Sequence, residues 1–369
     1  MKILLLVDRL DIAGGLERSL ANKVKTWCEE GRDVHIATID QQGPDYYAID
    51  ARAIRSKLDI HYDREISLLA IANLKRAIRH FMALRRVYLQ ARPTHVVHSG
   101  YGFDFFFLPL IARGAFLIKE NHSSRHRAEG MVRSTFDHVK TKIRTWFDSR
   151  YHVSVFLSKE EAQLSGLRNT VIIPNALENR VIPEHLTKRN QVISAGRICA
   201  VKGFDRLVEA WSLASPQMPG WHLVIYGDGT VADVAEIQHK ISFLGLSDSV
   251  SVYPATLDVI DRMAESRVYA MASRSECFPM VLLEAMQVSL PIVAYNCPTG
   301  PRNIVVHDET GILVPDGDAA SFANALVKLA SNPEVAESIA RNARQSSERY
   351  SSGDIASMWS ALFSRGAVQ

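Results

Sequence analysis

The fold is decided by residues 191–215, QVISAGRICAVKGFDRLVEAWSLAS. A short apolar run at 191–195 meets a glycine-flanked loop, and a helical pattern follows at 204–215. A strand, a loop and a helix in this order form the repeating unit of a parallel sheet, whose buried strands read as continuous apolar runs. The stretch therefore predicts an α/β domain built on a parallel sheet.

Segments of the same kind recur along both halves of the chain. In the second half, further strands are expected at 222–226, 250–253, 268–272 and 291–295, and helices at 231–244, 257–266, 280–288 and 319–331. In the first half, strands are expected at 2–7, 34–39, 94–98, 116–120, 153–157 and 171–174, and helices at 17–29 and 74–91. This alternation predicts two parallel-sheet α/β domains. The polar stretch 184–190 is the best linker candidate, which gives domains of residues 1–183 and 184–351.

Composition narrows the class of protein. The chain has 369 residues, of which 47% are hydrophobic and 22% charged, as is typical of a globular protein with two domains of ordinary size. Its cysteines, Cys28, Cys199, Cys277 and Cys297, have neither disulfide-framework nor zinc-site spacing. The apolar start, residues 1–7, is too short for a signal peptide, and no transmembrane helix is expected. A reducing cytoplasm is therefore the expected compartment.

Charge is distributed unevenly between the two halves. Residues 1–180 carry 28 Lys and Arg against 20 Asp and Glu, whereas residues 181–369 carry 15 against 20. The first half is therefore basic and the second acidic, within a net charge of +3.

The basic excess concentrates in one predicted helix. Between Glu65 and Asp104 there is no acidic residue, and the spacing predicts a buried face formed by Leu74, Ile78, Phe81, Leu84 and Tyr88. The other face then gathers Lys75, Arg76, Arg79, Arg85 and Arg86. A solvated surface is the ordinary explanation of such a run. Attraction to an anionic membrane, at roughly 1 kcal/mol per nearby cation, is the alternative and would place the protein on the inner face of the cytoplasmic membrane. Nucleic acid is not an expected partner, because no aromatic-interleaved module accompanies the charge.

Two glutamates flank a predicted helix start in SECFPMVLLEAM, residues 275–286. Pro279 suits the first turn of a helix, so Glu276 is expected in the preceding loop and Glu284 about a turn and a half inside the helix. The free amides at the helix start can receive an anion, and a carboxylate on either side can bind hydroxyls. This arrangement suits a nucleotide-sugar.

Two cations project from the loop GRICAVKGFD, residues 196–205. Arg197 offers a planar fork of donors and Lys202 a compact charge, so together they can neutralise a diphosphate. A surface loop with solvated cations is the alternative. Glu276 and Glu284, whose arrangement suits a nucleotide-sugar, favour diphosphate binding over a merely solvated loop.

Two glycine-rich turns suggest other ligands. Gly14 and Gly15 follow the first strand and open a helix, where a phosphate or sugar can approach the amides, although a tight turn explains them equally well. The string GDGTVA, residues 227–232, fits a dinucleotide-binding pattern, so a nicotinamide or flavin enzyme is an alternative. That alternative leaves the two glutamates and the two loop cations without a role.

A polar cluster, ENHSSRHR, occupies residues 120–127 after a strand of the first half. His122 is a candidate site residue, because parallel sheets bind ligands at the carboxyl ends of their strands. Metal binding is the weaker interpretation, since His122 and His126 would need acidic ligands that are not nearby. The loop CPTGP, residues 297–301, is expected to border the same site.

Together the motifs resemble the retaining glycosyltransferases of family 4, which have the GT-B fold. The resemblance covers nearly the whole chain and rests on GGLERSL at 14–20, ENHSS at 120–124, GRICAVKGFDRLVEAW at 196–211, YGDG at 226–229, SECFPMVLLEAM at 275–286 and CPTGP at 297–301. It implies two Rossmann-like domains facing a cleft. The first would bind the acceptor and be completed by a helix at 352–369, and the second would bind the nucleotide-sugar.

The resemblance also implies residue roles in the second domain. Arg197 and Lys202 would bind the diphosphate, Glu284 the ribose hydroxyls and Glu276 the donor hexose. Other donor contacts would come from the segment at the helix start, Phe278, Pro279 and Met280.

In the first domain, the resemblance implies that Gly14 and Gly15 close over the donor and that His122 lies beside the transferred sugar. The expected catalytic set is then Glu276, His122, Arg197 and Lys202, with no metal ion and no cofactor. Departures from the family pattern at Cys277, at Ser289 and in YPAT, residues 253–256, leave the nucleotide and the sugar open.

The function predicted from all this is transfer of a hexose or N-acetylhexosamine from a UDP-sugar to a glycan or lipid-linked acceptor in cell-surface polysaccharide or lipopolysaccharide synthesis. Anomeric retention and metal independence are expected. A UDP-sugar epimerase of the same fold, a non-catalytic nucleotide-sugar-binding subunit and an NAD-dependent oxidoreductase are the alternatives. A glycosidase fits less well, because its carboxyls need to be about 5–9.5 Å apart, whereas eight helical residues span ~12 Å.

Overall fold

The computed structural model describes residues 1–12, 14–63, 66, 70–100, 102–124, 135–178 and 187–366. Its contacts divide the chain into two units, one of Met1–Glu178 with Ser352–Gln369 and one of Asn179–Ser351. The expected domain border between residues 183 and 184 lies outside the described residues, as does His126.

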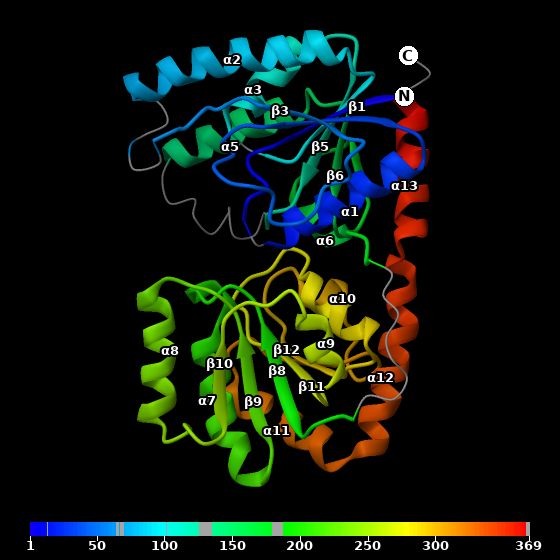
Figure 1. Ribbon diagram of the computed structural model, residues 1–369. Coiled ribbons are helices and arrows are strands. Elements are labelled where there is room, and N and C mark those ends of the chain that lie inside the picture. Colours follow the sequence, from blue (N-terminus) through cyan, green and yellow to red (C-terminus); the bar gives the residue numbers. More distant parts are fainter. Residues whose placement is uncertain are drawn as a thin grey trace. The chain divides into compact units, whose positions relative to one another are not determined.

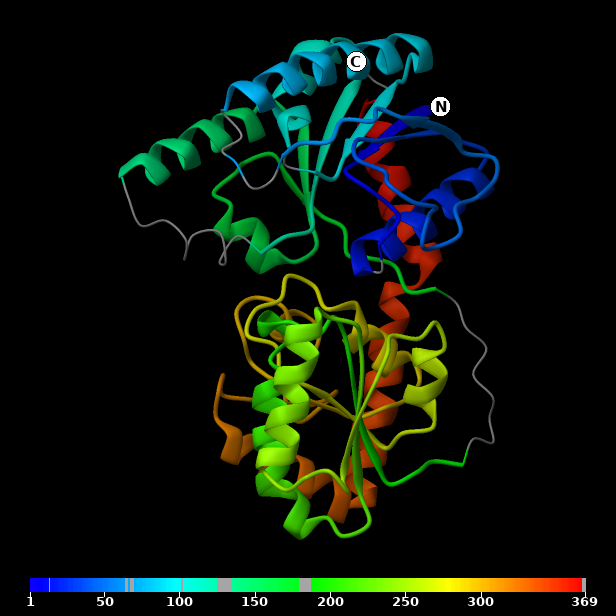
Figure 2. The ribbon, with the colours of Figure 1, turned by 60° about the vertical axis from the view of Figure 1, so that its left-hand side comes forward.

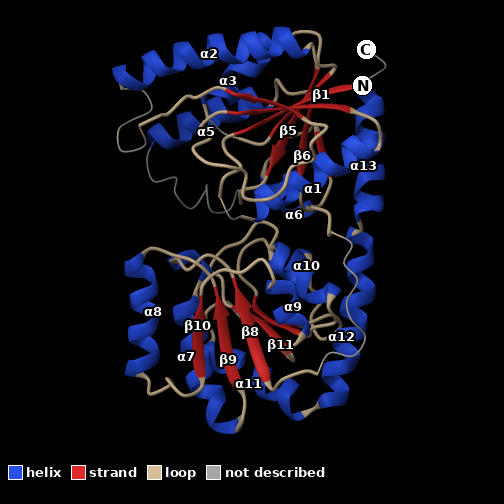
Figure 3. Cartoon of the chain, in the orientation of Figure 1, coloured by secondary structure: helices blue, strands red, loops and turns tan. Residues whose placement is uncertain are grey.

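The first unit is built on a parallel sheet whose described strands have the order β3-β2-β1-β4-β5-β6-β7. The order reverses between β1 and β4, and Figure 3 shows the strands in red. The strands are β1 (Lys2–Val7), β2 (Asp33–Thr38), β3 (Ile54–Lys57), β4 (His95–His98), β5 (Phe116–Asn121), β6 (Val153–Phe156) and β7 (Thr170–Ile172).

Helices cover both faces of this sheet (Figures 1 and 2). Alternate residues of β1 point to opposite faces, as a strand requires. Ile3 and Leu5 pack with α1 (Gly15–Glu29) and α13 (Ser352–Gly366), whereas Leu4 and Leu6 pack with the layer opposite. That layer contains α2 (Ile71–Ala91), α3 (Phe103–Ile111) and α5 (Thr135–Asp148), and α6 (Lys159–Leu164) contacts β6 and β7.

The face that α2 buries differs from the predicted one. Leu84 is buried as expected, but Leu74 is 42% exposed and Ile78 is 64% exposed, so the prediction for these two residues was wrong. Asn73 and His80 lie on the inner face instead. Asn73 accepts a hydrogen bond from the amide of Asp63 and donates one to its carbonyl, and His80 bonds the hydroxyl of Tyr62 at 3.0 Å. Polar partners supplied by residues 62–63 therefore override the apolar spacing.

The second unit has its own parallel sheet, with the described strands in the order β10-β9-β8-β11-β12-β13. Here the order reverses between β8 and β11. The strands are β8 (Gln191–Ala195), β9 (His222–Tyr226), β10 (Val250–Tyr253), β11 (Val268–Met271), β12 (Ile292–Tyr295) and β13 (Ile312–Val314). The predicted class, two Rossmann-like parallel-sheet units, is confirmed.

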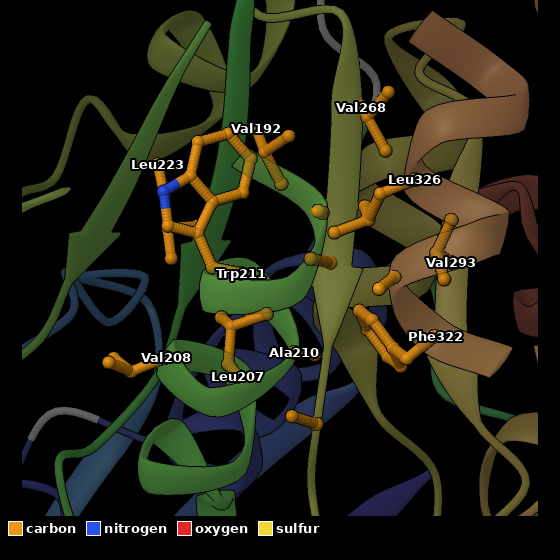
Figure 4. Packing of buried hydrophobic residues seen from close by; sticks show 14 of the residues in the cluster. Val192, Leu207, Val208, Ala210, Trp211, Leu223, Val268, Val293, Phe322 and Leu326 are labelled. Atoms are coloured by element: carbon orange, nitrogen blue, oxygen red, sulfur yellow. The ribbon is translucent and has the colours of Figure 1, made fainter. Parts of the chain in front are cut away.

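One face of this second sheet carries a continuous apolar core. Trp211 of helix α7 (Phe204–Ala214) packs near Val192 and Leu223, and Phe322 of helix α11 (Ala319–Ser331) packs near Val293 (Figure 4). The helices of the unit are α7 (Phe204–Ala214), α8 (Val231–Phe243), α9 (Val259–Ala264), α10 (Met280–Gln287), α11 (Ala319–Ser331) and α12 (Pro333–Ser347). No helix in the described part of the chain is long and apolar enough to cross a membrane.

Candidate functional site

The loops after β8 and β11 leave the second sheet where its strand order reverses. Open parallel sheets bind ligands at such a point, outside the carboxyl ends of the strands. Lys202 from the first loop donates to Oε1 of Glu276 in the second loop at 2.7 Å. Their side chains are 27% and 12% exposed. The structure thus brings together two of the predicted site residues as a partly exposed ion pair.

Two hydroxyls hold the Glu276 side chain and backbone in place. The Ser273 hydroxyl donates to Oε1 at 2.7 Å, and the Thr299 hydroxyl donates to the Glu276 carbonyl at 2.8 Å. A Cβ at Gly300 would lie 2.4 Å from the Cβ of Glu276 and 2.9 Å from Cδ of Pro279, so glycine is needed there. Oε2 accepts no hydrogen bond within the described residues and remains available to a hydroxyl donor.

An ion pair that the sequence did not reveal fixes the cationic loop. Arg274 donates to both carboxylate oxygens of Asp205, at 2.7 and 2.5 Å, and also to the Ala200 carbonyl at 2.6 Å. These hydrogen bonds raise the pKa of Arg274. Arg274 lies between the end of β11 and Glu276, and this position among polar loop residues is the one signal that could have drawn attention to it.

Gly203 lets the cationic loop approach the end of β11. Its φ is +65°, and a Cβ there would lie 2.1 Å from the carbonyl oxygen of Ala272. A side chain at this position would therefore meet both backbone strain and a clash with a fixed carbonyl. Arg197, in contrast, is exposed on the same loop.

The dinucleotide-like turn after β9 has a structural explanation. A Cβ at Gly227 would lie 2.0 Å from the carbonyl oxygen of Gly196, and one at Gly229 would lie 2.4 Å from that of Ile198. The N-terminus of α8 is closed by a capping box, in which Thr230 and Asp233 satisfy one another's backbone amides. A carboxylate therefore lies where a dinucleotide phosphate would need to bind.

The segment that starts α10 is packed into the unit. Phe278, Pro279 and Met280 are buried, and no side chain among the described residues caps this helix start. Glu284 is also buried. Burial and the two nearby glutamates raise the pKa of Tyr269, whose hydroxyl donates to the Ala195 carbonyl at 3.2 Å. The Tyr269 phenol therefore stays protonated and neutral beside the carboxylates.

In the first unit, Gly14 is the N-cap of α1, and Gly15 is its first residue. A Cβ at Gly14 would lie 2.1 Å from Oε2 of Glu17, so the glycine gives that carboxylate room over the helix start. An anionic ligand at these amides would meet the charge of Glu17, whereas a sugar hydroxyl could donate to it.

His122 belongs to a buried polar cluster at the carboxyl ends of β4 and β5. Its Nε2 lies 3.2 Å from Oε1 of Glu120, which also pairs with Lys23 of α1. The Ser99 hydroxyl donates to the second oxygen of Glu120 at 3.0 Å. The expectation that no acid lies near His122 was therefore wrong. Even so, the described residues contain no group of three or more His, Cys, Asp or Glu able to hold a metal ion.

Burial sets the protonation of this cluster. Burial alone would raise the pKa of Glu120, but its neighbours, chiefly the charge of Lys23, outweigh burial and hold that pKa well below its usual range. Burial also lowers the pKa of His122 more than Glu120 raises it. Burial likewise lowers the pKa of Lys23 more than its pairing with Glu120 raises it, so Glu120 lies between a lysine and an imidazole whose pKa values are both lowered.

Comparison with known proteins agrees with this architecture. Residues 175–346 match the family described as glycosyl transferases group 1. An uncharacterized glycosyltransferase of Haemophilus influenzae is 26% identical, with 98% of this chain and 99% of that protein covered. The amylovoran biosynthesis glycosyltransferase AmsD of Erwinia amylovora is 27% identical, with the same coverage. The crystal structure of Anabaena HepE in complex with UDP-glucose has a TM-score of 0.77 at 17% identity, covering 99% of this chain and 100% of that one.

The two parallel-sheet units and this structural likeness identify the fold as the expected GT-B fold. The range that matches the glycosyl transferases group 1, residues 175–346, contains Lys202, Glu276 and Glu284.

Proposed function

We propose that this glycosyltransferase moves a hexose or N-acetylhexosamine from a UDP-sugar to a glycan or lipid-linked saccharide acceptor, with retention of anomeric configuration, as in family 4. The observation that carries the proposal is the Lys202–Glu276 ion pair where the strand order of the second sheet reverses. A protonated lysine has three donors. Lys202 can therefore hold Glu276 with one and bind diphosphate oxygens with the others.

Each predicted residue has a place in this proposal. Arg197 and Lys202 neutralise the diphosphate, and the uncapped start of α10 at residues 278–280 adds backbone dipoles. Glu276 accepts hydrogen bonds from hexose hydroxyls through Oε2, and Glu284 binds the ribose.

In the same proposal, Gly14, Gly15 and His122 bind the donor sugar. For the glycines, the carboxylate of Glu17 favours contact with a sugar hydroxyl over contact with a phosphate.

The proposed chemistry relies on charge stabilisation and needs no divalent metal. The bond between the anomeric carbon and the diphosphate oxygen breaks, and the acceptor oxygen bonds to that carbon on the same face. The departing phosphate takes the acceptor proton. Arg197 and Lys202 stabilise the charge that develops on the leaving group, as preorganised donors do in other enzymes. If the proposal holds, EDTA leaves the rate of transfer unchanged.

A role in cell-surface polysaccharide or lipopolysaccharide synthesis is supported by AmsD, whose name assigns it to amylovoran biosynthesis. UDP as the donor nucleotide is supported by HepE, which was crystallised with UDP-glucose.

A thermal-shift screen with UDP, GDP, ADP, NAD and several UDP-sugars tests the donor. UDP and one UDP-sugar should raise Tm, because a ligand at 100 times its Kd stabilises the folded state by about 2.7 kcal/mol. Lys202→Met should reduce the shift, whereas Lys240→Met, which removes a partly exposed lysine of α8, should not. A shift with NAD alone would overturn the proposal in favour of an oxidoreductase. Binding without transfer would indicate a non-catalytic subunit, and conversion of the UDP-sugar itself would indicate an epimerase.

We further propose that α2 attaches the protein peripherally to an anionic membrane surface. Five exposed apolar side chains form one stripe along this helix, which has no acidic residue: Ile71, Leu74, Ile78, Met82 and Leu89. Exposed cations flank the stripe, namely Lys75, Arg79, Arg85 and Arg86. An apolar stripe bordered by cations is typical of helices that lie in the interface of a bilayer. In the described part of the opposite layer, α1 and α13 expose one large apolar side chain, Met358.

Sedimentation with phosphatidylglycerol and phosphatidylcholine vesicles tests the attachment. The protein should bind the anionic vesicles, and the Arg79→Gln/Arg85→Gln/Arg86→Gln variant should lose most of that binding. The control Lys25→Gln/Lys57→Gln, which removes two exposed cations elsewhere in the unit, should bind nearly as the wild type does. Unchanged binding of the triple variant would refute the membrane role.

A further inference from the structure

We propose that Glu120 is a positioning residue: it fixes the imidazole of His122 with the proton on Nε2, so that Nδ1 is presented as a hydrogen-bond acceptor. The inference rests on the proposed function, in which His122 lies beside the transferred sugar. It adds Glu120 to the residues proposed to act in transfer and assigns a tautomer to His122.

The geometry of Glu120 supports this role. Residues 120 and 122 are two apart at the end of β5, so their side chains project to the same face. His122 Nε2 is buried, makes no hydrogen bond within the described residues, and lies 3.2 Å from Oε1 of Glu120. A neutral imidazole has one N–H and one acceptor nitrogen, and the hydrogen bond at one nitrogen decides the state of the other. The negative charge of the Glu120 carboxylate, this close to Nε2, attracts a proton on that nitrogen and repels a lone pair there, so the proton is favoured on Nε2.

The carboxylate is itself held in place. Lys23 pairs with Oε1 of Glu120, and Ser99 donates to Oε2, so the glutamate cannot turn away from the imidazole. The Lys23 ammonium lies 4.7 Å from the ring centroid of Trp359 and 5.9 Å from that of Trp27. Trp359 of α13 thus helps to position Lys23, and Lys23 in turn positions Glu120.

A purely structural role for Glu120, as the counter-ion of a buried lysine, predicts different behaviour. In that case a variant without either charge would restore normal turnover. The decisive variant is therefore Lys23→Met/Glu120→Gln, which removes both buried charges and preserves the side-chain volumes.

The double variant should fold, keep its donor KM within about threefold and lose about 10- to 100-fold in kcat, the range seen when the partner that orients a metal-bound histidine is removed. On a His122→Ala background, the same two substitutions should not lower kcat further, because the imidazole that Glu120 orients is already absent. Wild-type kcat in the double variant, or losses that multiply with that of His122→Ala, would overturn the inference.

A spectroscopic measurement tests the tautomer independently of activity. In protein with ¹⁵N-labelled histidine, the His122 signals, assigned by their loss in His122→Asn, should show the proton on Nε2 and should change in Glu120→Gln. Asp104→Asn is the matched control, because it alters another buried His–carboxylate pair, His98–Asp104, on the opposite face of the sheet. A His122 proton on Nδ1 in the wild type would refute the assignment.

Substitution of His122 itself separates the two nitrogens. Asparagine places its amide close to the position of Nδ1, and glutamine places its amide close to that of Nε2. If Nδ1 is the working acceptor, His122→Asn should retain more activity than His122→Gln, and the reverse order would contradict the proposal. Wild-type transfer by His122→Ala would overturn this inference alone, whereas absence of transfer from every UDP-sugar would overturn the proposed function.

Discussion

Two lysine–glutamate pairs, one in each unit, differ in how far they are exposed. Lys202 and Glu276 join two loops of the second unit, with side chains 27% and 12% exposed. Lys23 and Glu120 join a helix to a strand of the first unit, with side chains 7% and 1% exposed. A partly exposed lysine can share its donors with an incoming phosphate. A fully enclosed pair has no such access and can act only through a third residue, here His122.

The same difference decides what each pair contributes to stability. A pair near the surface gains little, about 0–1 kcal/mol, because water already solvates both charges. Removing one member of a buried pair leaves an uncompensated charge in a medium of low polarity and costs about 3–5 kcal/mol. The first pair should therefore matter chiefly for activity, and the second for the fold as well.

The largest effect is expected for Lys23→Met. The substitution leaves Glu120 buried without its counter-ion and should lower the free energy of unfolding by about 3–5 kcal/mol, measured by urea denaturation at pH 7. Adding Glu120→Gln should recover most of the loss, since the second charge is then removed too. A loss below 1 kcal/mol would show that the two pairs do not differ in this respect.

A smaller effect on free energy, but a large one on rate, is expected for Lys202→Met. It should change the free energy of unfolding by less than about 1 kcal/mol. Loss of one preorganised donor to the leaving group should reduce kcat about 10²- to 10³-fold, in a steady-state assay with the UDP-sugar found by the screen. Lys240→Met, which removes another partly exposed lysine of the same unit, is the control and should keep the wild-type rate. Equal rates for the two variants would remove Lys202 from the site.

The sequence predicts the second unit better than the first, and for a physical reason. Strands β8, β9 and β10 begin and end at the predicted residues, because each is an apolar run bounded by polar turns. The strands β3 and β13 were not predicted, and both are short and lie at sheet edges. In β3 (IRSK) no residue is buried, so its apolar signal is weak, whereas β13 (ILV) is apolar but only three residues long.

The two ion pairs also differ in how far the sequence alone predicts them. Lys202 and Glu276 occur in loop motifs that directly follow strands, so each could be recognised from its own neighbours in the sequence. Lys23 and Glu120 are 97 residues apart and have no local pattern that links them. Their pairing, like that of Asp205 with Arg274, follows from tertiary packing. Of the three residues Lys23, Glu120 and His122, the resemblance to a family pointed only to His122.

A second buried lysine, Lys119, lies next to Glu120 in β5 but on the opposite face of the sheet. Its titration extends the comparison to the dependence of stability on pH. Its Nζ donates to the Glu120 carbonyl at 2.8 Å and to the His98 carbonyl at 3.3 Å. Burial lowers the pKa of Lys119 from 10.5 to about 7. Between these values the unfolded chain binds about one more proton than the folded chain.

The free energy of unfolding should therefore rise with pH above about 7, and this titration contributes about 1.4 kcal/mol per pH unit. Below that pH, Lys119 is protonated in both states and adds no slope. Urea denaturation at steps from pH 7 to 8.5 measures the effect, and Lys119→Met should lose this part of the slope while Lys240→Met keeps it. An unchanged slope in Lys119→Met would mean that the folded protein keeps Lys119 charged throughout this range. Burial would then not be enough to neutralise a lysine in this sheet. Lys23 would therefore depend less on Glu120 for its charge than the comparison of the two pairs requires.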